Sequence, residues 1–502
     1  MFLDNMKSDL SHSVHGEDPE NSSAVYKPSM TLTENGAVTY ASSGSECVNL
    51  FGTIGALRNS SSEEIRSRFS EAFRENRNLA VRIAFYARDV RGGLGERKVF
   101  REILLWLEQY SPDSVRKNLA LIPEYGRFDD FLCLIGTSCE NEVISLIKSQ
   151  LENDIKAENP SLLSKWLPSV NASNQEARRL ARTIAKSLGM NWKEYRQMLS
   201  RLRAKLSLLE NYMREKDYTF DYSKQPSQAM LKHIKAFVAR DNERYTKFLE
   251  AVKAGKTELK TKTLMPYEII RPLCTFRYCN LSKQELEALD VTWNSQEDYT
   301  NGENSIVVAD VSGSMRGQPM EVSVSLAIYF AERNKGAFRN HFITFSGNPN
   351  LVEIRGGNIC EKVLLCMRAD WGNNTDLQKV FELILSTALK HKVPQSELPS
   401  TLYIISDMEF DSCIQGAGMT NFDYAKKLFN DNGYELPRVV FWNVNSRNLQ
   451  QPVRMNEQNV CLVSGLTARI FQMVASAQIE NFTPESVMLE VLNGERYVHI
   501  TA

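Results

Sequence analysis

Five short apolar runs in the C-terminal part of the chain constrain its fold most. They occupy residues 305–310, 341–346, 402–407, 438–444 and 460–463, and helical segments lie between them. Runs that are apolar along their whole length are typical of strands buried on both faces, and intervening helices indicate parallel pairing. The pattern therefore predicts, for residues 291–502, a doubly wound, mostly parallel sheet with helices on both faces.

Polar loops follow three points in this predicted sheet. Asp310, Ser312 and Ser314 come directly after the first run, Thr375 lies in a polar loop at 371–376, and Asp407 lies in the loop at 406–409. In a doubly wound sheet, loops at the carboxyl ends of the strands meet at the switch point. Hydroxyls and carboxylates without a neighbouring His or Cys suit a hard cation and disfavour zinc. We therefore predict a divalent-cation site, with Mg²⁺ as the expected ion.

These five positions resemble, in order and in structural context, the metal-ion-dependent adhesion site (MIDAS) of von Willebrand A domains. The DxSxS motif of that family matches Asp310, Ser312 and Ser314, and its later threonine and aspartate match Thr375 and Asp407. The resemblance implies a von Willebrand A-type domain over residues 291–502. It also implies that one ligand position is left to water or to a partner's carboxylate, as in a binding module.

The preceding region, residues 41–290, has a helical pattern. From about Ser61 to Pro272, apolar residues recur at helical spacing, as at Ile65, Phe69 and Phe73, and Gly, Pro, Ser and Asp separate the helices. Short punctuated helices of varying period predict paired helices stacked as an irregular HEAT-like α-solenoid. Residues 1–40 are rich in Ser, Asp, Glu and Asn, and we expect a disordered tail there.

Charge is distributed unevenly along the helical region. Residues 161–265 contain 22 Lys and Arg but 10 Asp and Glu, a net charge of +12, whereas the whole chain has a net charge of −1. Two successive predicted helices carry nine of these cations opposite apolar stripes: Arg178, Arg179, Arg182, Lys186, Lys193, Arg196, Arg201, Arg203 and Lys205. A single helix of this kind is more often a solvated surface. Two in succession favour contacts with phosphates, so we predict that these residues bind RNA.

Two other features receive structural interpretations. The segment 92–98 is glycine-rich, but it lacks the spacing of a phosphate-binding loop and follows a helix, so it predicts a tight turn between helices. Trp106, Trp166 and Trp192 are interpreted as packing residues rather than base-stacking platforms. Because no aromatic RNA-recognition motif is present, we expect recognition of RNA shape, ends or backbone rather than of each base.

Motifs along residues 45–500 resemble the TROVE module of the Ro autoantigen family. They resemble more closely a TROVE-like family that also ends in a von Willebrand A domain. The matching segments are 92–97, 118–130, 165–168, 179–186, 195–203, 226–230, 241–245 and 266–269. The resemblance implies a ring of HEAT-like helices closed by the metal-site domain, and a ribonucleoprotein that binds small structured or misfolded noncoding RNA. The helix at 193–205 has no histidine, where one is expected in Ro proteins, so the RNA contacts would differ.

The function we predict is a nonenzymatic RNA-binding scaffold with a metal-dependent A domain. The alternative is a metal-dependent protein-interaction or assembly factor without RNA binding, in which a protein partner supplies a carboxylate to the metal. An RNA-processing enzyme would need catalytic residues, and Asp376, Glu409 and Asp411 near the metal loops have no accompanying nucleophile or base. Nine scattered cysteines without a CxxC pair, no apolar run of 18 residues and no secretory signal predict a cytoplasmic protein with reduced thiols.

Overall fold

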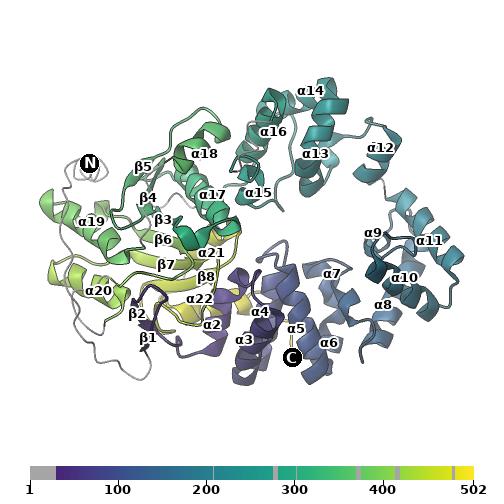
Figure 1. Ribbon diagram of the computed structural model, residues 1–502, viewed down its shortest axis with the longest axis horizontal. Coiled ribbons are helices and arrows are strands. Elements are labelled where there is room, and N and C mark those ends of the chain that lie inside the picture. Colours follow the sequence, from purple (N-terminus) through teal and green to yellow (C-terminus); the bar gives the residue numbers. More distant parts are fainter. Residues whose placement is uncertain are drawn as a thin grey trace. The chain divides into compact units, whose positions relative to one another are not determined.

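The computed structural model contains two compact units, shown as one ribbon in Figure 1. It describes residues 30–206, 208–274, 281–300, 302, 304–368, 375–412, 419–476 and 481–502. The sheet unit comprises residues 1–60 and 261–494, and the helical unit comprises residues 61–260 and 495–502. This division differs from the boundary expected at residue 290, because residues 41–60 and 261–290 pack with the sheet and residues 495–502 with the helices.

The sheet unit is built on six strands in the order β5-β4-β3-β6-β7-β8. Their bounds are β3 (Ile306–Asp310), β4 (His341–Phe345), β5 (Leu351–Glu353), β6 (Thr401–Ser406), β7 (Arg438–Asn443) and β8 (Val460–Ser464). Neighbours pair in parallel except β5, which is antiparallel to β4. The chain runs outward from β3 to β5 and resumes at β6 on the other side of β3, so the switch point lies between β3 and β6. The predicted α/β sheet is confirmed, with β5 as an additional edge strand.

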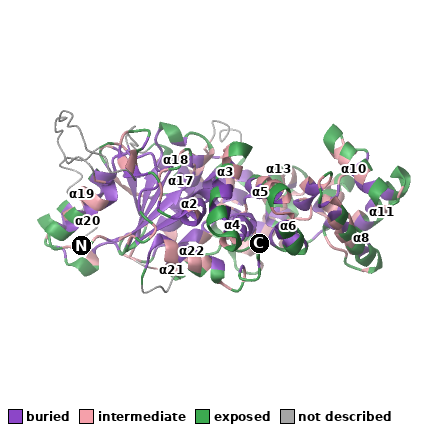
Figure 2. Cartoon of the chain, turned by 90° about the horizontal axis from the view of Figure 1, so that it is seen from below, coloured by how far each residue is buried: buried purple, intermediate pink, exposed green. Residues whose placement is uncertain are grey.

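Helices cover this sheet, and its strands other than the edge strand β5 are buried almost completely (Figure 2). The helices of the sheet unit are α2 (Glu46–Thr53), α15 (Pro266–Ile270), α16 (Lys283–Asn294), α17 (Gln318–Arg333), α18 (Ile359–Met367), α19 (Leu377–Lys390), α20 (Asn421–Asp431), α21 (Arg469–Ser476) and α22 (Pro484–Asn493). Helix α17 packs on β3 and β4, and α2 and α22 pack on β8. The approach of the segment after α2 to β8 requires glycine, because a Cβ at Gly55 would lie 2.6 Å from the Cα of Gly465.

The expectation of a disordered tail over residues 1–40 is wrong for residues 30–40; residues 1–29 lie outside the described part of the chain. Strands β1 (Met30–Leu32) and β2 (Val38–Tyr40) form an antiparallel pair. The backbone of Tyr40 exchanges hydrogen bonds with that of Gln451, at 3.0 and 2.8 Å. Ordering of this segment therefore comes from partners far along the chain, which its own composition cannot reveal.

The helical unit consists of short helices that pack against their neighbours in sequence. They are α3 (Ser62–Glu75), α4 (Arg77–Arg88), α5 (Arg97–Tyr110), α6 (Pro112–Asn118), α7 (Ile122–Tyr125), α8 (Glu140–Lys156), α9 (Leu163–Trp166), α10 (Gln175–Ser187), α11 (Trp192–Lys205), α12 (Leu209–Glu215), α13 (Ser227–Arg240) and α14 (Asn242–Lys253). The glycine-rich segment between α4 and α5 is a tight turn, as predicted, since a Cβ at Gly93 would collide with the carbonyl oxygen of Tyr86. The paired helices agree with the predicted helical region, and closure into a ring stays a prediction. No helix among the described residues is both long and apolar enough to cross a membrane.

Residues 495–502 complete the helical unit by lying against α4 and the helices after α5. Arg496 donates from Nη2 to Oδ1 of Asp89 at 2.7 Å, and the hydroxyl of Tyr497 donates to Oδ2 at 2.9 Å. Nδ2 of Asn118 donates a hydrogen bond to the carbonyl oxygen of Thr501 at 2.6 Å. The side chain of Asp89 is fully buried, so these bonds compensate a carboxylate that has lost its water.

Candidate metal centre and candidate nucleic-acid surface

The first part of the candidate metal centre lies at the switch point of the sheet. Strand β3 carries Asp310 into the interior, where the residue is 0% exposed. Its Oδ1 accepts a hydrogen bond from the Ser312 backbone N–H at 2.8 Å, and its Oδ2 accepts one from the hydroxyl of Ser406, the last residue of β6, at 2.7 Å. The hydroxyls of Ser312 and Ser314 lie 3.0 Å apart. The DxSxS loop is thus folded tightly against the neighbouring strand.

Asp407 supplies a second buried carboxylate beside this loop. Its Oδ1 accepts from the Glu409 backbone N–H at 3.3 Å, whereas its Oδ2 accepts no hydrogen bond and lies 3.2 Å from Nη2 of Arg447 in an ion pair. Burial raises the pKa of Asp310 to about 7, and the negative charge of Asp407 contributes to the shift. Two neighbouring carboxylates with nearby hydroxyls are a donor set that fits a hard cation, although Oδ2 of Asp407 is shared with Arg447.

The remaining predicted ligand, Thr375, is bonded to the segment that follows Asp407. Its backbone N–H donates to Oδ2 of Asp411 at 2.7 Å, and its hydroxyl lies within donating distance of the Glu409 carbonyl, at 2.9 Å. The structure therefore places Thr375 beside the 407–411 loop, while residues 371–374 of the predicted loop lie outside the described part of the chain. Within that part, no group of three or more His, Cys, Asp or Glu is placed to hold a metal, so a cation here would depend on the hydroxyls.

Several residues around this centre were not identified from the sequence. Asn35, which follows β1, donates from Nδ2 to the hydroxyl of Thr375 at 3.3 Å and to the carbonyl of Glu409 at 2.7 Å. The buried carboxylate of Glu409 accepts from the backbone N–H of Glu34 at 2.8 Å and from the side chain of Gln450 at 2.7 Å. These partners lie far apart in sequence, so no local motif links them.

Asp376, Glu409 and Asp411, the acidic residues considered as candidates for hydrolysis, accept hydrogen bonds that hold nearby segments in place. Glu409 anchors the segment after β1, and Asp411 holds Thr375. Asp376 is the N-cap of α19, and its Oδ1 accepts from the backbone N–H of Lys379 at 3.0 Å. A cap of this kind satisfies an otherwise unpaired helix N–H. Each of the three carboxylates therefore has a role in holding loops together.

Helices α10 and α11 present the predicted basic residues. Each begins at an asparagine cap, Asn174 for α10 and Asn191 for α11, whose side chain accepts backbone N–H bonds. Each buries only a narrow apolar stripe, so exposed residues cover much of both helices (Figure 2). Six cations on them are exposed, and their side chains make no ion pair or hydrogen bond with any described residue. We call this set the basic surface: Arg179, Arg182, Lys186, Lys193, Arg196 and Arg201.

Three of the nine predicted RNA contacts are instead engaged within the protein. Arg203 is half-buried and donates to the carbonyls of Ser164 and Leu167, at 2.8 and 2.7 Å, and to the hydroxyl of Ser169, at 2.8 Å. Arg178 donates to the carbonyl of Ala172 at 3.0 Å. Lys205 donates to the carbonyl of Ala157 at 3.1 Å. The three side chains donate to backbone carbonyl oxygens of neighbouring segments. Helical periodicity alone could not reveal these bonds.

Comparisons with known proteins assign the chain to a family. Residues 33–152 and 142–299 match the family model described as a domain of unknown function, DUF2828. The chain belongs to the DUF2828 family. Residues 304–494 match a second domain of unknown function, DUF7788. The uncharacterized protein L728 of Acanthamoeba polyphaga mimivirus is 32% identical to this DUF2828 protein over 512 residues, covering 93% of this chain and 88% of the viral protein.

Among solved structures, the crystal structure of the Deinococcus radiodurans RO (RSR) protein is similar to this DUF2828 protein. The match covers 90% of this chain and 100% of the other, with a TM-score of 0.34 and 11% sequence identity.

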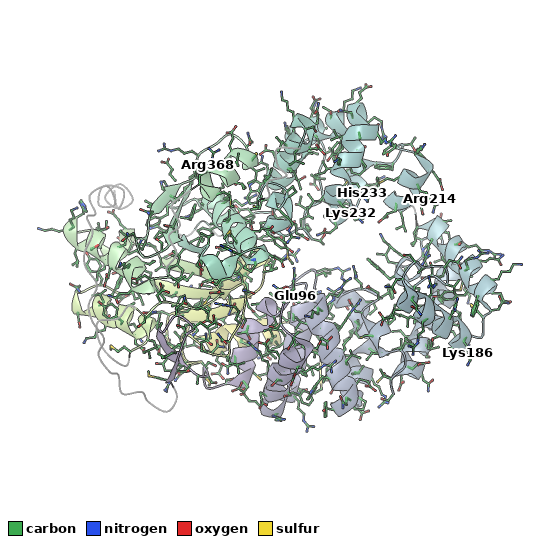
Figure 3. The ribbon with its side chains drawn as sticks, in the orientation of Figure 1. Glu96, Lys186, Arg214, Lys232, His233 and Arg368 are labelled. Carbon is green, nitrogen blue, oxygen red and sulfur yellow. The ribbon has the colours of Figure 1, made fainter. Side chains whose placement is uncertain are left out.

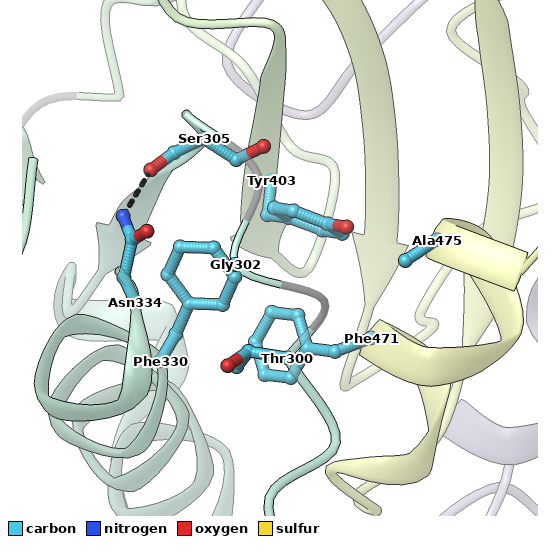
Figure 4. Close-up of a pocket in the computed structure, with 8 residues that line it drawn as sticks. All are labelled: Thr300, Gly302, Ser305, Phe330, Asn334, Tyr403, Phe471 and Ala475. Atoms are coloured by element: carbon cyan, nitrogen blue, oxygen red, sulfur yellow. Dashed lines mark hydrogen bonds between the residues drawn. The ribbon is translucent and has the colours of Figure 1, made fainter. Parts of the chain in front are cut away.

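A small cavity of the sheet unit lies beside Ser305, the residue before β3 (Figure 4). Phe330, Tyr403 and Phe471 line it, and Nδ2 of Asn334 donates to the carbonyl of Ser305 at its edge, at 2.7 Å. Its volume is about 10 Å³, which has room for a single water at most. This DUF2828 protein therefore does not use that cavity as a ligand site.

Proposed function

We propose that this protein binds RNA through the basic surface on α10 and α11. The observation that carries the proposal is that six exposed cations on two adjacent helices have no acidic partner among the described residues. Lys and Arg side chains attract phosphates when no acidic residue neutralises them. Each contact with a phosphate releases counterions that were condensed on the RNA. With a net charge of −1 for the whole chain, this attraction is local to the helical unit.

The kind of RNA follows from the chemistry of the surface. Lys and Arg side chains on helices contact phosphates without reading a base sequence, which suits recognition of shape and of unpaired ends. The resemblance to the TROVE module supports RNA as the polyanion. We therefore propose small structured or misfolded noncoding RNA as the ligand, and a scaffold role for the protein in a ribonucleoprotein.

The test compares two variants of the full chain that lose the same charge. One carries Arg179→Gln, Lys186→Gln, Lys193→Gln and Arg201→Gln. The control carries Lys335→Gln, Arg339→Gln, Arg368→Gln and Lys427→Gln, which are exposed cations of the sheet unit. Figure 3 labels one residue of each set, Lys186 and Arg368.

Affinity for a labelled RNA hairpin with a single-stranded tail is measured by fluorescence anisotropy. We expect the first variant to lose at least tenfold in affinity and the control to remain within twofold of the wild type. Equal losses in both variants, or no binding by the wild type, would overturn the proposal.

We further propose that Asp310, Ser312, Ser314, Thr375 and Asp407 hold a divalent cation, with Mg²⁺ as the expected ion. The buried Asp407 oxygen that accepts no hydrogen bond supports this assignment. Bound Mg²⁺ would supply a coordination position for water or for an acidic group of a protein partner. Isothermal titration of the wild type with MgCl₂ should give saturable binding that Asp310→Ala abolishes. Absence of binding to the wild type would refute the site and leave the RNA proposal intact.

A further inference from the structure

Trp192 differs from the packed tryptophans of this protein. It is the first residue of α11, and 54% of its surface is exposed, whereas Trp293 and Trp442 are fully buried. Trp192 is therefore not a core residue, although its ring does contact the neighbouring helix α10 through Arg182. A large aromatic ring held at the surface has lost little water and is available to a partner.

The ring of Trp192 is held in a defined environment. The guanidinium carbon of Arg182, one turn before Lys186 on α10, lies 4.3 Å from the centre of the indole ring. A cation over the ring orients it by a cation–π contact, and more than half of the surface of Trp192 stays exposed. Gly189, with a φ of +71°, provides the left-handed residue that turns the chain from α10 towards α11.

An open hollow of about 730 Å³ adjoins this ring at the junction of α10 and α11. It is lined by Arg182, Thr183, Lys186, Gly189, Met190, Asn191 and Trp192. It thus combines an exposed π face, a thioether and two cations of the basic surface within one helix–helix turn. A planar ring joined to a phosphate is the ligand chemistry that satisfies all of these groups together.

Two polar groups of the hollow are engaged within the protein. The side-chain oxygen of Asn191 accepts the backbone N–H groups of Lys193 and Glu194, both at 3.0 Å. The hydroxyl of Thr183 donates to the carbonyl of Arg179 at 3.2 Å. Because these two groups are bonded within the protein, they are not free to read a base edge, and we expect little discrimination among the four nucleotides.

We propose that Trp192 is a stacking platform for an unpaired nucleobase of RNA, with Arg182 and Lys186 contacting the adjoining phosphate. This inference rests on the proposed RNA-binding function and deepens it, because it makes the α10–α11 junction selective for single strands. In a duplex, each base is stacked on its neighbours and cannot lie on the indole without unstacking. The site therefore favours tails, loops and misfolded ends over fully paired segments.

The experiment uses the full chain with a labelled 12-nucleotide single-stranded RNA and with a fully paired duplex. The variants are Trp192→Ala, Trp192→Phe, which keeps an aromatic ring, and Tyr110→Ala. Tyr110 on α5 is the matched control, because it is an aromatic residue of the same unit with 62% of its surface exposed.

We expect Trp192→Ala to bind the single strand about tenfold more weakly, a typical loss for one base–aromatic stack. Trp192→Phe should retain most of the affinity, and Tyr110→Ala should bind as the wild type does. Duplex affinity should be the same in all four proteins. Ultraviolet crosslinking of the wild type, followed by mass spectrometry, should place a crosslinked nucleotide on the peptide that contains Trp192.

Four results would overturn the stacking assignment. If Trp192→Ala binds the single strand as the wild type does, while loss of the basic surface still abolishes binding, the inference fails and the proposed function stands. If the affinity for duplex falls as much as that for the single strand, Trp192 acts through the fold and not as a platform. If Trp192→Ala converts a dimer into a monomer in sedimentation, the ring is buried between copies of the chain. Failure of the wild type to bind any RNA removes both proposals.

Discussion

Arg447 forms an ion pair with Asp407, with Nη2 of the arginine 3.2 Å from Oδ2 of the aspartate. Its Nη1 lies 2.7 Å from Glu34, so the guanidinium bridges the segment after β1 and the candidate metal centre. The carboxylate of Asp407 is buried, whereas a third of the Arg447 side chain is exposed. The arginine places a positive charge where a divalent cation would also be attracted. Arg447 therefore competes with the cation for the charge of Asp407.

Replacing Arg447 with methionine should tighten Mg²⁺ binding by about three- to tenfold, because it removes a charge that repels the ion across a partly solvated gap. Isothermal titration measures the change. Arg355→Met is the control, since Arg355 forms a solvent-exposed ion pair with Glu353 in the same unit. Unchanged or weaker binding in Arg447→Met would show that the arginine does not oppose the cation.

Replacing Arg496 with methionine should destabilise the helical unit. The substitution leaves the buried carboxylate of Asp89 without its ion pair, and removing one partner of such a pair costs about 3 kcal/mol. Urea unfolding followed by circular dichroism reports the loss. Arg74→Met breaks an exposed ion pair with Glu71 and should cost below about 0.5 kcal/mol. Similar losses in the two variants would contradict the role of Arg496.

The stability of the helical unit should depend on pH through Asp89. Burial by itself would raise the pKa of Asp89, but hydrogen bonds from Arg496, Tyr497 and the Arg91 N–H outweigh it and lower the pKa below 3.8. A group whose pKa is lower in the folded protein stabilises the fold above its unfolded pKa, and this contribution disappears as pH falls through the folded pKa. Asp89→Asn should therefore be less stable than the wild type at pH 7, with the difference shrinking below about pH 4. A difference that stays constant from pH 7 to pH 3, in urea titrations, would exclude this linkage.

Two neighbouring arginines of α11 should behave differently. Arg201 belongs to the basic surface, so Arg201→Ala should lower the salt dependence of RNA binding by about 0.7 in the slope of log K against log salt, without loss of stability. Arg203 holds the carbonyls of Ser164 and Leu167, so Arg203→Ala should lose about 1–3 kcal/mol of stability and leave the slope unchanged. Anisotropy titrations at several salt concentrations, together with urea unfolding, separate the two effects. An equal change of slope in both variants would mean that Arg203 also contacts a phosphate of the RNA, which contradicts its internal role.

The same pair of arginines shows where inference from sequence ends. Both lie on a helix with a clear apolar stripe, and periodicity places both away from the core. Arg203 differs from Arg201 because it bonds to residues 164–169, which include most of α9 and the segment after it. Trp192 is a similar case, because its exposure depends on how α10 and α11 meet.

The sheet was more predictable than its surroundings. Strands β3, β4, β6, β7 and β8 are continuous apolar runs, so the order of apolar residues along the sequence was enough to locate them. It also located the loop at Asp310, which follows the first of these strands. Strand β5 has three residues, which is too short to show a period. Strands β1 and β2 were not predicted, because their ordered structure depends on partners such as Gln451, more than 400 positions later in the sequence.

The bond between Asp89 and Arg496 spans 407 residues, and the larger segment of the sheet unit, residues 261–494, is synthesised in between. At about 5–20 residues per second, a ribosome exposes the carboxylate of Asp89 for roughly 20–80 s before its counter-ion emerges. During that interval the nascent helices carry an interior charge that nothing neutralises. Maturation of the helical unit is thus timed by the completion of its neighbour rather than by its own translation.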